Sequence, residues 1–320
     1  MQPRIAFPLL RVSAIVGARS IGRLYVNRYD KVMARIAKGE RILIDGATGT
    51  EIERRGVPQL DGAWNGGGAL SHPDTLRQVH KDYIRQGAEI VISNTFATHR
   101  QALRIAGEEE NFDAYNRRGV ELAIEARDET NAPHVLVAGG ISYWAWTGPW
   151  VDPQELSASA GEQAAIMADA GADLLMLEMM VDIERMLATL KAAQETGLPV
   201  WVGLSCKPNE AGTMCLYQGD TLADALDALA GKNVPLVNIM HTEVDYIDAC
   251  LDIVADHWSG PVGVYAHSAR WVNNVCYYDQ TVSPSEYAQS AGGWLSRDVR
   301  VIGACCGLGV DHIAALKQIV

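Results

Sequence analysis

The stretch GADLLMLEMM at residues 171–180 decides the fold. Its run Leu174–Leu177 is continuously apolar and lacks the polar alternation of a strand that has one face in water. A second run of this kind, Val135–Ala138, precedes it in the chain. Strands that are buried on both faces belong to parallel sheets covered by helices. The two runs therefore predict an α/β protein with a parallel sheet.

Short runs of this type recur along the chain and alternate with segments of helical periodicity. We expect eight strands, at Arg41–Asp45, Glu89–Asn94, His134–Gly140, Asp173–Glu178, Val200–Ser205, Val234–Met240, Val262–Ala266 and Val299–Ala304. Helix stop signals such as Gly87 close the segments between them, and Asp311 is the expected N-cap of the last helix. Eight consecutive βα units predict a single (β/α)8 TIM barrel over residues 39–320.

The competing α/β architecture is an open, doubly wound sheet. Such a sheet usually carries a glycine-rich nucleotide-binding turn after its first strand. The turn after the first expected strand reads GATGT at 46–50 and lacks the GxGxxG spacing. The sequence therefore favours the barrel.

Composition and charge narrow the class of protein. The 320 residues are 48% hydrophobic and carry a net charge of −12, which argues against a nucleic-acid partner because phosphate binding needs a basic surface. The apolar runs are too short for a membrane-spanning helix. Six cysteines are too few for a disulfide scaffold and indicate a reduced, cytoplasmic protein. We expect small-molecule partners and leave a homo-oligomer open.

Residues 1–38 differ from the rest of the chain, because they hold several arginines and Asp30 as their only acid. They are predicted to form an N-terminal extension, either helical or disordered. An arginine-rich, acid-poor start is also typical of organelle transit peptides. If residues 1–32 are such a peptide, the location is an organelle instead of the cytoplasm.

The adjacent cysteines Cys305 and Cys306 follow the eighth expected strand. Active sites of barrels lie at the carboxyl ends of the strands, and cysteine thiolates are good zinc ligands. Gly303 and Gly307 flank the pair and would let the backbone turn so that both sulfurs face one ion. The alternative is that two small buried cysteines simply fill the end of the barrel.

A catalytic zinc keeps three protein ligands and one open position, so a third ligand is needed. His241 ends the sixth expected strand and is the preferred candidate. His267 and Cys206 also end strands and are rival candidates.

Two carboxylates, Asp45 and Glu178, end the first and fourth expected strands. A buried carboxylate needs a partner or its pKa rises, and the ammonium group of a substrate would supply that partner. The alternative role is to accept backbone N–H groups and brace a loop. Asn94 and Thr95, which end the second strand, are expected to join the same substrate site.

Tryptophans cluster in the loop after the third expected strand, which contains Trp144, Trp146 and Trp150. Aromatic faces bind quaternary ammonium and sulfonium groups by cation–π attraction, worth about 0.5–2 kcal/mol each. Trp64 is expected to contribute to the same wall. The alternative is that the loop only packs over the rim of the barrel.

Several motifs, taken in order, resemble the homocysteine S-methyltransferase family, which includes the betaine and S-methylmethionine enzymes. The resemblance covers about residues 41–319. It rests on Trp64 and on five stretches, LIDGATGTEIERRG (43–56), HPDTLRQVHKDYIRQGAEIVISNTFATHRQAL (72–103), VAGGIS (137–142), GADLLMLEMM (171–180) and GACCG (303–307).

The resemblance implies a zinc ion (Zn2+) on Cys305, Cys306 and one more cysteine, whose place His241 takes in this chain. It also implies that Asp45, Gly46 and Glu178 hold the amino acid end of homocysteine. His-Cys-Cys is an accepted zinc set, and the neutral imidazole makes the site less negative by about one charge. The family has Pro-Asn where this chain has Ala266-His267, which leaves room for a thiol other than homocysteine.

The expected reaction moves a methyl group from a small onium donor to the thiol, giving methionine when the thiol is homocysteine. S-methylmethionine, betaine and dimethylsulfonio compounds are suitable donors, because their leaving groups depart neutral and need no general acid. Two other classes of function stay open at this point. One is a metal-dependent hydrolase or lyase, and the other is a divergent, non-catalytic barrel that binds a methylated metabolite.

Overall fold

The computed structural model describes residues 27–145, 149–272, 275–278 and 281–320. Eight parallel strands form one sheet in the order β1-β12-β9-β8-β5-β4-β3-β2. Their bounds are β1 Ile42–Leu43, β2 Ile90–Ile92, β3 Leu136–Ile141, β4 Leu174–Met180, β5 Val200–Leu204, β8 Val237–Glu243, β9 Val262–His267 and β12 Val299–Ile302. All eight predicted strands are therefore confirmed, with ends that differ by a few residues.

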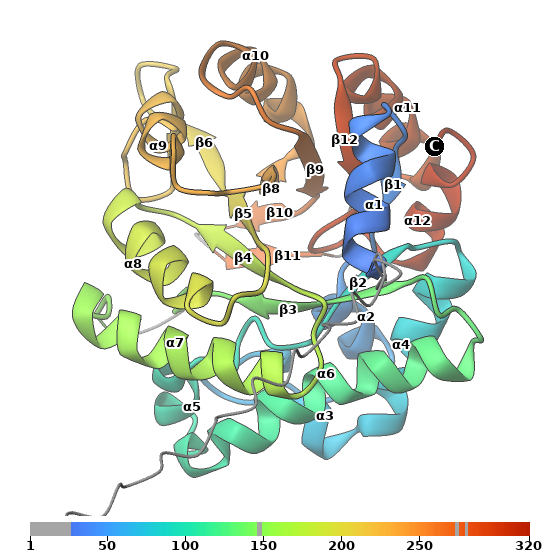
Figure 1. Ribbon diagram of the computed structural model, residues 1–320, viewed down its shortest axis with the longest axis vertical. Helices are drawn as coiled ribbons and strands as arrows, with labels where there is room; N and C mark the ends of the chain where they lie inside the picture. Colours follow the sequence, from blue (N-terminus) through green and yellow to red (C-terminus); the bar gives the residue numbers. More distant parts are fainter. Residues whose placement is uncertain (1–26, 146–148, 273–274, 279–280) are drawn as a thin grey trace, which may run out of the picture.

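The sheet curves until its first and last strands in the order meet. A parallel bridge joins Ile44, just after β1, to Ile90 at the start of β2, and the Asp45 amide donates to the Ile90 carbonyl. Helices surround the strands (Figure 1), as the (β/α)8 prediction requires. The TIM barrel is therefore confirmed.

The helices match the predicted alternation with the strands. Their bounds are α1 Arg28–Ala37, α2 Thr48–Arg54, α3 Gly68–Ser71, α4 Pro73–Arg85, α5 Arg100–Ile105, α6 Phe112–Glu129, α7 Pro153–Asp169, α8 Ile183–Gln194, α9 Leu222–Leu229, α10 Ile247–His257, α11 Pro284–Leu295 and α12 Val310–Leu316, with 3-10 turns at Asn65–Gly67, Glu109–Asn111 and Val244–Tyr246. One predicted cap is wrong. Asp311 lies inside the first turn of α12, and Gly309 is the N-cap without a side-chain bond.

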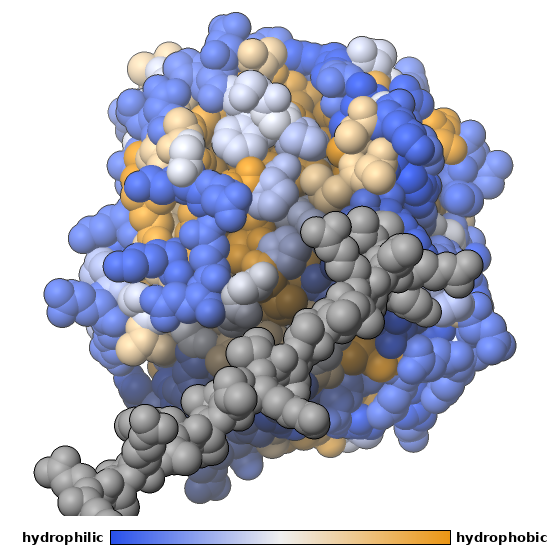
Figure 2. All heavy atoms as spheres, viewed as in Figure 1, coloured by the Kyte–Doolittle hydropathy of each residue, from blue (hydrophilic) through white to orange (hydrophobic). Residues whose placement is uncertain are grey.

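The strands predicted from the apolar runs form the core of the barrel. Every residue of β3, β4 and β5 is buried, since these strands face the barrel interior on one side and helices on the other. Figure 2 shows one face of the molecule, with hydrophilic residues around the rim and more apolar residues toward the centre. Within the described part of the chain, none of the helices combines the length and apolar composition needed to cross a membrane.

Helix α1 falls within the predicted N-terminal extension and packs on the amino-terminal end of the barrel, in front of the strands in Figure 1. Arg35 forms an ion pair with Glu89, just before β2, and Arg28 lies 2.9 Å from Asp173, just before β4. The Trp201 indole N–H donates to the Tyr29 hydroxyl at 3.0 Å. The division at residues 38 and 39 stays a prediction, as does any role for residues 1–26, which lie outside the described residues.

Two antiparallel hairpins interrupt the βα alternation and were missed by the sequence analysis. The first, β6 (Cys206–Pro208) with β7 (Met214–Leu216), follows β5. The second, β10 (Arg270–Val272) with β11 (Val275–Tyr277), follows β9. Both follow the carboxyl ends of barrel strands, so they add loops to the end where a barrel has its active site.

Candidate active site at the carboxyl end of the barrel

A cavity of about 850 Å³ opens at the carboxyl end of the strands, a region called the mouth below. Residues from the ends of β1, β2, β4, β8, β9 and β12 line it, together with residues of α2 and of the loop after β3. Chain segments that are far apart in sequence therefore meet at one place. Predicted site residues among its lining are Asp45, Gly46, Trp64, Asn94, Trp144, Glu178, His241, Cys305 and Cys306.

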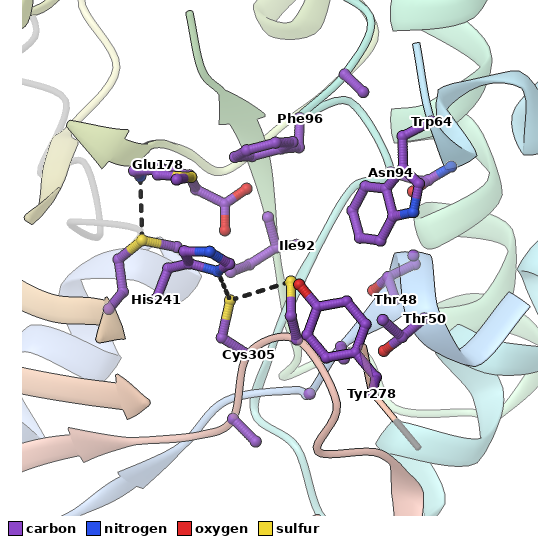
Figure 3. A pocket seen from close by; sticks show the side chains of 18 of the residues that line it. Thr48, Thr50, Trp64, Ile92, Asn94, Phe96, Glu178, His241, Tyr278 and Cys305 are labelled. Carbon is purple, nitrogen blue, oxygen red and sulfur yellow. Dashed lines mark hydrogen bonds between the residues drawn. The ribbon is translucent and has the colours of Figure 1, made fainter. Parts of the chain in front are cut away.

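His241, Cys305 and Cys306 bring three metal-binding atoms together. The Cys305 Sγ lies 3.6 Å from His241 Nδ1 and 3.8 Å from Cys306 Sγ (Figure 3). All three ligand atoms lie within 4.8 Å of one another, and all three residues are half-buried. Among the described residues this is the one group of three or more such side chains close enough to share an ion.

The loop that carries the two cysteines is held by its backbone. Gly307 has a φ of +84°, and a Cβ there would lie 2.3 Å from the Ser268 carbonyl oxygen, so glycine is required. Two residues of α2 hold the same glycine, because its amide donates to Thr50 Oγ1 at 3.3 Å and its carbonyl accepts from Arg54 at 2.7 Å. The predicted turn at Gly307 is therefore present, and α2 fixes it.

His241 points to the cysteines because β8 is irregular at this point. The pairing of β8 with β9 shifts between Met240 and Glu243, as in a β-bulge. His241 itself has a positive φ of +42°, a conformation that is uncommon for any residue other than glycine. The Tyr217 hydroxyl donates to the His241 carbonyl at 2.8 Å. The bulge therefore turns the imidazole into the cavity.

The two rival ligands lie elsewhere. Cys206 is buried, and its contact with the thiol of Cys250 raises the pKa of Cys206. His267 is fully buried behind His241, with the two ring centroids 4.2 Å apart, and neither rival lines the cavity. The geometry therefore favours His241 as the third ligand.

The two adjacent thiols differ in acidity. Contact with the Cys305 thiol lowers the pKa of Cys306 well below its usual value, and the imidazoles of His241 and His267 act in the same direction. Thiolates, not thiols, bind metals. The pair therefore offers one sulfur that is ready to bind a cation.

Asp45 and Glu178 are both buried in the lining of the cavity. Asp45 Oδ2 accepts the Ile92 amide at 2.7 Å, yet burial raises its pKa well above the usual value. Burial also raises the pKa of Glu178, and Asp45 and Cys306 add to the effect. Neither carboxylate makes an ion pair with a described residue. A cationic group entering the cavity would therefore meet two carboxyl groups that no side chain of the described residues neutralises.

Small residues make room for these carboxylates. A Cβ at Gly140, in the VAGGIS motif, would lie 2.7 Å from Glu178 Oε2. At Gly46 a Cβ would lie 2.8 Å from the Leu308 carbonyl oxygen, so the loop after β1 packs directly on the loop after β12. Gly46 therefore shapes the site through its backbone.

The second strand contributes one lining residue and one supporting residue. Asn94 lines the cavity, and its amide donates to the Asn65 carbonyl at 2.8 Å. Thr95 is fully buried outside the lining, and its hydroxyl donates to the Gly140 carbonyl at 2.7 Å. Of the two residues, only Asn94 is placed where a substrate could reach it.

Aromatic side chains form one wall of the cavity. Trp144 packs edge-on against Trp150 and Tyr217, with ring centroids 5.6 and 6.2 Å away. Trp64 lies on another side of the cavity near Asn94 (Figure 3) and has a φ of +42°. Trp146, also predicted for this wall, lies outside the described residues.

Several residues of this site were not predicted. Phe96, Tyr217 and Tyr265 line the cavity, and of these only Phe96 lies in a stretch that carries the resemblance. The Tyr265 hydroxyl is buried without a hydrogen-bond partner among the described residues. His99 holds the tryptophan loop, since its Nε2 lies 2.8 Å from the Trp144 carbonyl oxygen, and burial lowers its pKa to about 4. Its position in the NTFATHR segment of the resemblance was the only signal in the sequence.

Comparison with known proteins assigns this architecture to a family. Residues 42–320 match the family model described as homocysteine S-methyltransferase. The chain is 27% identical to homocysteine S-methyltransferase of Escherichia coli over 91% of this chain and 99% of that one. It is 25% identical to selenocysteine methyltransferase of Astragalus bisulcatus over 88% of this chain and 93% of that one.

A solved structure gives the same result. The metallated form of the homocysteine methyltransferase MmuM from Escherichia coli superposes with a TM-score of 0.73 at 25% identity. The match covers 89% of this chain and 98% of that one. These findings favour a methyltransferase over the hydrolase, lyase and non-catalytic alternatives.

Proposed function

The chain is an enzyme of the homocysteine S-methyltransferase family, and on that premise we propose that it methylates homocysteine from a small onium donor with the help of zinc. The observation that carries the proposal is the cluster of His241, Cys305 and Cys306. The cytoplasmic location stays a prediction.

The two separations from the Cys305 sulfur suit a tetrahedral zinc ion, and all three ligand atoms lie within 4.8 Å of one another. With Zn–S bonds of about 2.3 Å and a Zn–N bond of about 2.05 Å, tetrahedral edges are about 3.8 Å between sulfurs and about 3.6 Å between sulfur and nitrogen. The observed separations are 3.8 Å for Cys305 and Cys306 and 3.6 Å for Cys305 and His241. When bound there, zinc would supply the positive charge that keeps an acceptor thiol deprotonated near neutral pH.

The acceptor is oriented by the two buried carboxylates. Asp45 and Glu178 line the same cavity as the cysteine pair, and Cys306 is close enough to Glu178 to contribute to its raised pKa. The ammonium of homocysteine is a cation of suitable size for this position. It would lower both raised pKa values by pairing with the ionised carboxylates. This pairing supports an amino acid acceptor.

The donor is held by the aromatic wall. Trp144 and Tyr217 line the cavity in this wall, and such rings attract onium methyl groups. Trp64 lines another side of the cavity and is not part of the wall. The acceptor thiolate attacks the donor methyl carbon, so that a new C–S bond forms while the bond from that carbon to nitrogen or sulfur breaks. The bonding pair stays on the leaving atom, which departs neutral. The charges cancel, so no general acid is needed and a dry, aromatic cavity favours the reaction.

The test is direct. Zinc-loaded protein is incubated with homocysteine and, in separate reactions, with S-methylmethionine, betaine and dimethylsulfoniopropionate, and methionine is measured by mass spectrometry. We expect methionine from at least one donor at a rate that depends on enzyme concentration. Absence of methionine with every donor, from protein shown to hold zinc, would refute the proposed reaction.

A further inference from the structure

Two aromatic rings, those of His267 and Tyr217, pack against His241, and neither residue belongs to the proposed set of metal ligands. On one side, the ring of His267 approaches with its centroid 4.2 Å away at an interplanar angle of 71°. On the other, the ring of Tyr217 lies at 6.2 Å and 60°, and its hydroxyl donates to the His241 carbonyl at 2.8 Å. The imidazole thus has a packing neighbour on each side, and its backbone has a fixed partner.

His267 contacts a residue of the strand that carries His241, although neither of its ring nitrogens meets the geometry of a hydrogen bond among the described residues. Its Nε2 lies 2.9 Å from Glu243 Oε1, and Glu243 is the residue that pairs with His267 in the register of β8 and β9. His267 is fully buried, whereas the Glu243 side chain is 29% exposed. A series of contacts therefore runs from Glu243 on β8 to His267 on β9 and back to His241 on β8.

A histidine ligand has a stricter requirement than a cysteine ligand. The sulfur of cysteine can accept a metal over a wide range of directions, whereas an imidazole nitrogen binds only along its lone pair in the ring plane. His241 also has a positive φ of +42°, an uncommon backbone conformation that persists only where neighbours fix it. Residues that orient metal-bound histidines typically change metal affinity by about 10–100-fold when they are replaced.

We propose that His267 and Glu243, with Tyr217 on the opposite side, are positioning residues that hold the His241 imidazole in the orientation needed for a third metal ligand. The proposal rests on the proposed function, since it concerns the same metal site. His267 does not bind the ion in this arrangement. It acts through His241, and Glu243 acts through His267.

The first experiment compares His267→Asn and Glu243→Gln with the native chain. The dissociation constant for zinc is measured by competition with a chromophoric chelator, and the cobalt-substituted proteins are compared by their sulfur-to-cobalt absorption bands. We expect zinc to bind about 10–100-fold more weakly in both variants. The cobalt bands should keep their sulfur character but shift, because both cysteines remain while the imidazole is no longer fixed.

The chain offers a matched control. His257 on α10 lies 2.9 Å from Asp227, so it forms a histidine–carboxylate contact of the same length at the surface. His257→Asn should leave zinc affinity and the cobalt spectrum unchanged. An equal loss of affinity in His257→Asn would overturn the proposal, because it would show a general effect of removing such contacts.

A second experiment separates positioning from folding. In a His241→Cys background the third ligand no longer needs an oriented ring, so adding His267→Asn should change zinc affinity by less than about threefold, below the range expected for lost orientation. A loss as large as in the native background would mean that His267 only supports the fold, and the proposal fails. Absence of zinc from the native chain would refute the proposed function together with this proposal, whereas bound zinc with unaffected His267→Asn and Glu243→Gln variants would refute this proposal alone.

Discussion

The two ends of the barrel store backbone strain very differently. Six non-glycine residues have a positive φ among the described residues, and three of them lie in loops that lead into strands at the amino-terminal end. These three are Asn131, Asn233 and Asp298, the residue types that tolerate this conformation most easily. The strain at this end is therefore small.

At the mouth, the three residues with a positive φ are Trp64, Met179 and His241. Trp64 and Met179 have bulky side chains for which a positive φ is costly, whereas histidine tolerates it more easily. All three line the cavity, and Met179 and His241 sit where β4 and β8 lose their regular register. Strain in this molecule is thus concentrated where the predicted chemistry is.

Charged residues also differ between the two ends of the barrel. At the amino-terminal end, Arg35 pairs with Glu89 and Arg28 with Asp173. At the mouth, Asp45 and Glu178 are buried without a cation among the described residues. One end therefore contributes stability, while the other retains unfavourable groups for which the proposed metal and substrates would supply the partners.

Replacing a cysteine of the pair should have the largest effect. Cys306→Ser removes a sulfur ligand, so we expect zinc content to fall to background and methyl transfer to fall by more than about 10³-fold. Metal analysis and the methionine assay measure the two losses. Cys206→Ser, at a buried thiol outside the cavity, should keep both. Zinc retained at full stoichiometry in Cys306→Ser would contradict the assigned ligand set.

Replacing Glu178 should harm binding but help stability. Glu178→Gln removes one partner of the acceptor's ammonium, and we expect kcat/KM for homocysteine to fall by about 10²-fold. The folded-state pKa of Glu178 is raised, so the native protein binds more protons than the unfolded chain and loses stability as pH rises toward that pKa. At neutral pH the variant should therefore melt about 2 °C higher or more. A lower melting temperature would contradict the division between the two ends.

The same carboxylates should make ligand binding depend on pH. Methionine has no thiol, so calorimetric titration with methionine reports the ammonium site without interference from thiol ionisation. Since burial raises the pKa of both Asp45 and Glu178, affinity should rise with pH through a range above the ordinary carboxyl pKa of about 4, by up to about tenfold per unit for each carboxyl group that loses its proton on binding. The slope should be smaller in Glu178→Gln. A flat profile in the native chain would show that the carboxylates do not meet the ammonium.

Replacing Tyr265 should have a smaller effect on the binding of homocysteine. Its buried hydroxyl has no hydrogen-bond partner among the described residues, and the residue lines the cavity. We expect Tyr265→Phe to raise KM for homocysteine about fivefold, and to leave the melting temperature unchanged or slightly higher, because no described hydrogen bond is lost. A clear fall in melting temperature with unchanged KM would assign the hydroxyl to the fold instead.

At the other end, Arg35→Ala should give the smallest change and only in stability. The side chain is 36% exposed, so its ion pairs with Glu89 and Glu40 are screened by solvent and contribute about 0.5–1 kcal/mol. Urea unfolding measures this loss, and kcat and KM should match those of the native chain. Loss of activity at constant zinc content would show that the two ends are coupled.

The sequence predicted the barrel well because its strands are buried on both faces, and continuous apolar runs such as Leu174–Leu177 are typical of strands in a parallel sheet. It predicted the lining residues that carry strong chemistry, such as Cys305 and Glu178. It did not predict that Thr95 lies outside the cavity lining, because the local twist of the strand decides whether a side chain faces the cavity. Nor did it predict the two hairpins, whose strands of three residues are too short to show periodicity.

Residues that act through neighbours were the hardest to find. The sequence makes His267 a candidate ligand, because a histidine that follows a strand gives the same pattern whether it binds a metal or supports another histidine. Its contact with Glu243 depends on the bulge in β8, and one extra residue in a strand leaves no mark on hydrophobic periodicity. Tyr217 lies on a loop between β7 and α9 and reaches His241 only in three dimensions.

X-ray absorption at the zinc edge would identify the atoms that bind the metal. For the zinc-loaded chain we expect two sulfur neighbours and one imidazole nitrogen, from Cys305, Cys306 and His241, and a third sulfur after homocysteine is added. A zinc environment made only of nitrogen and oxygen, or one that homocysteine leaves unchanged, would contradict this expectation.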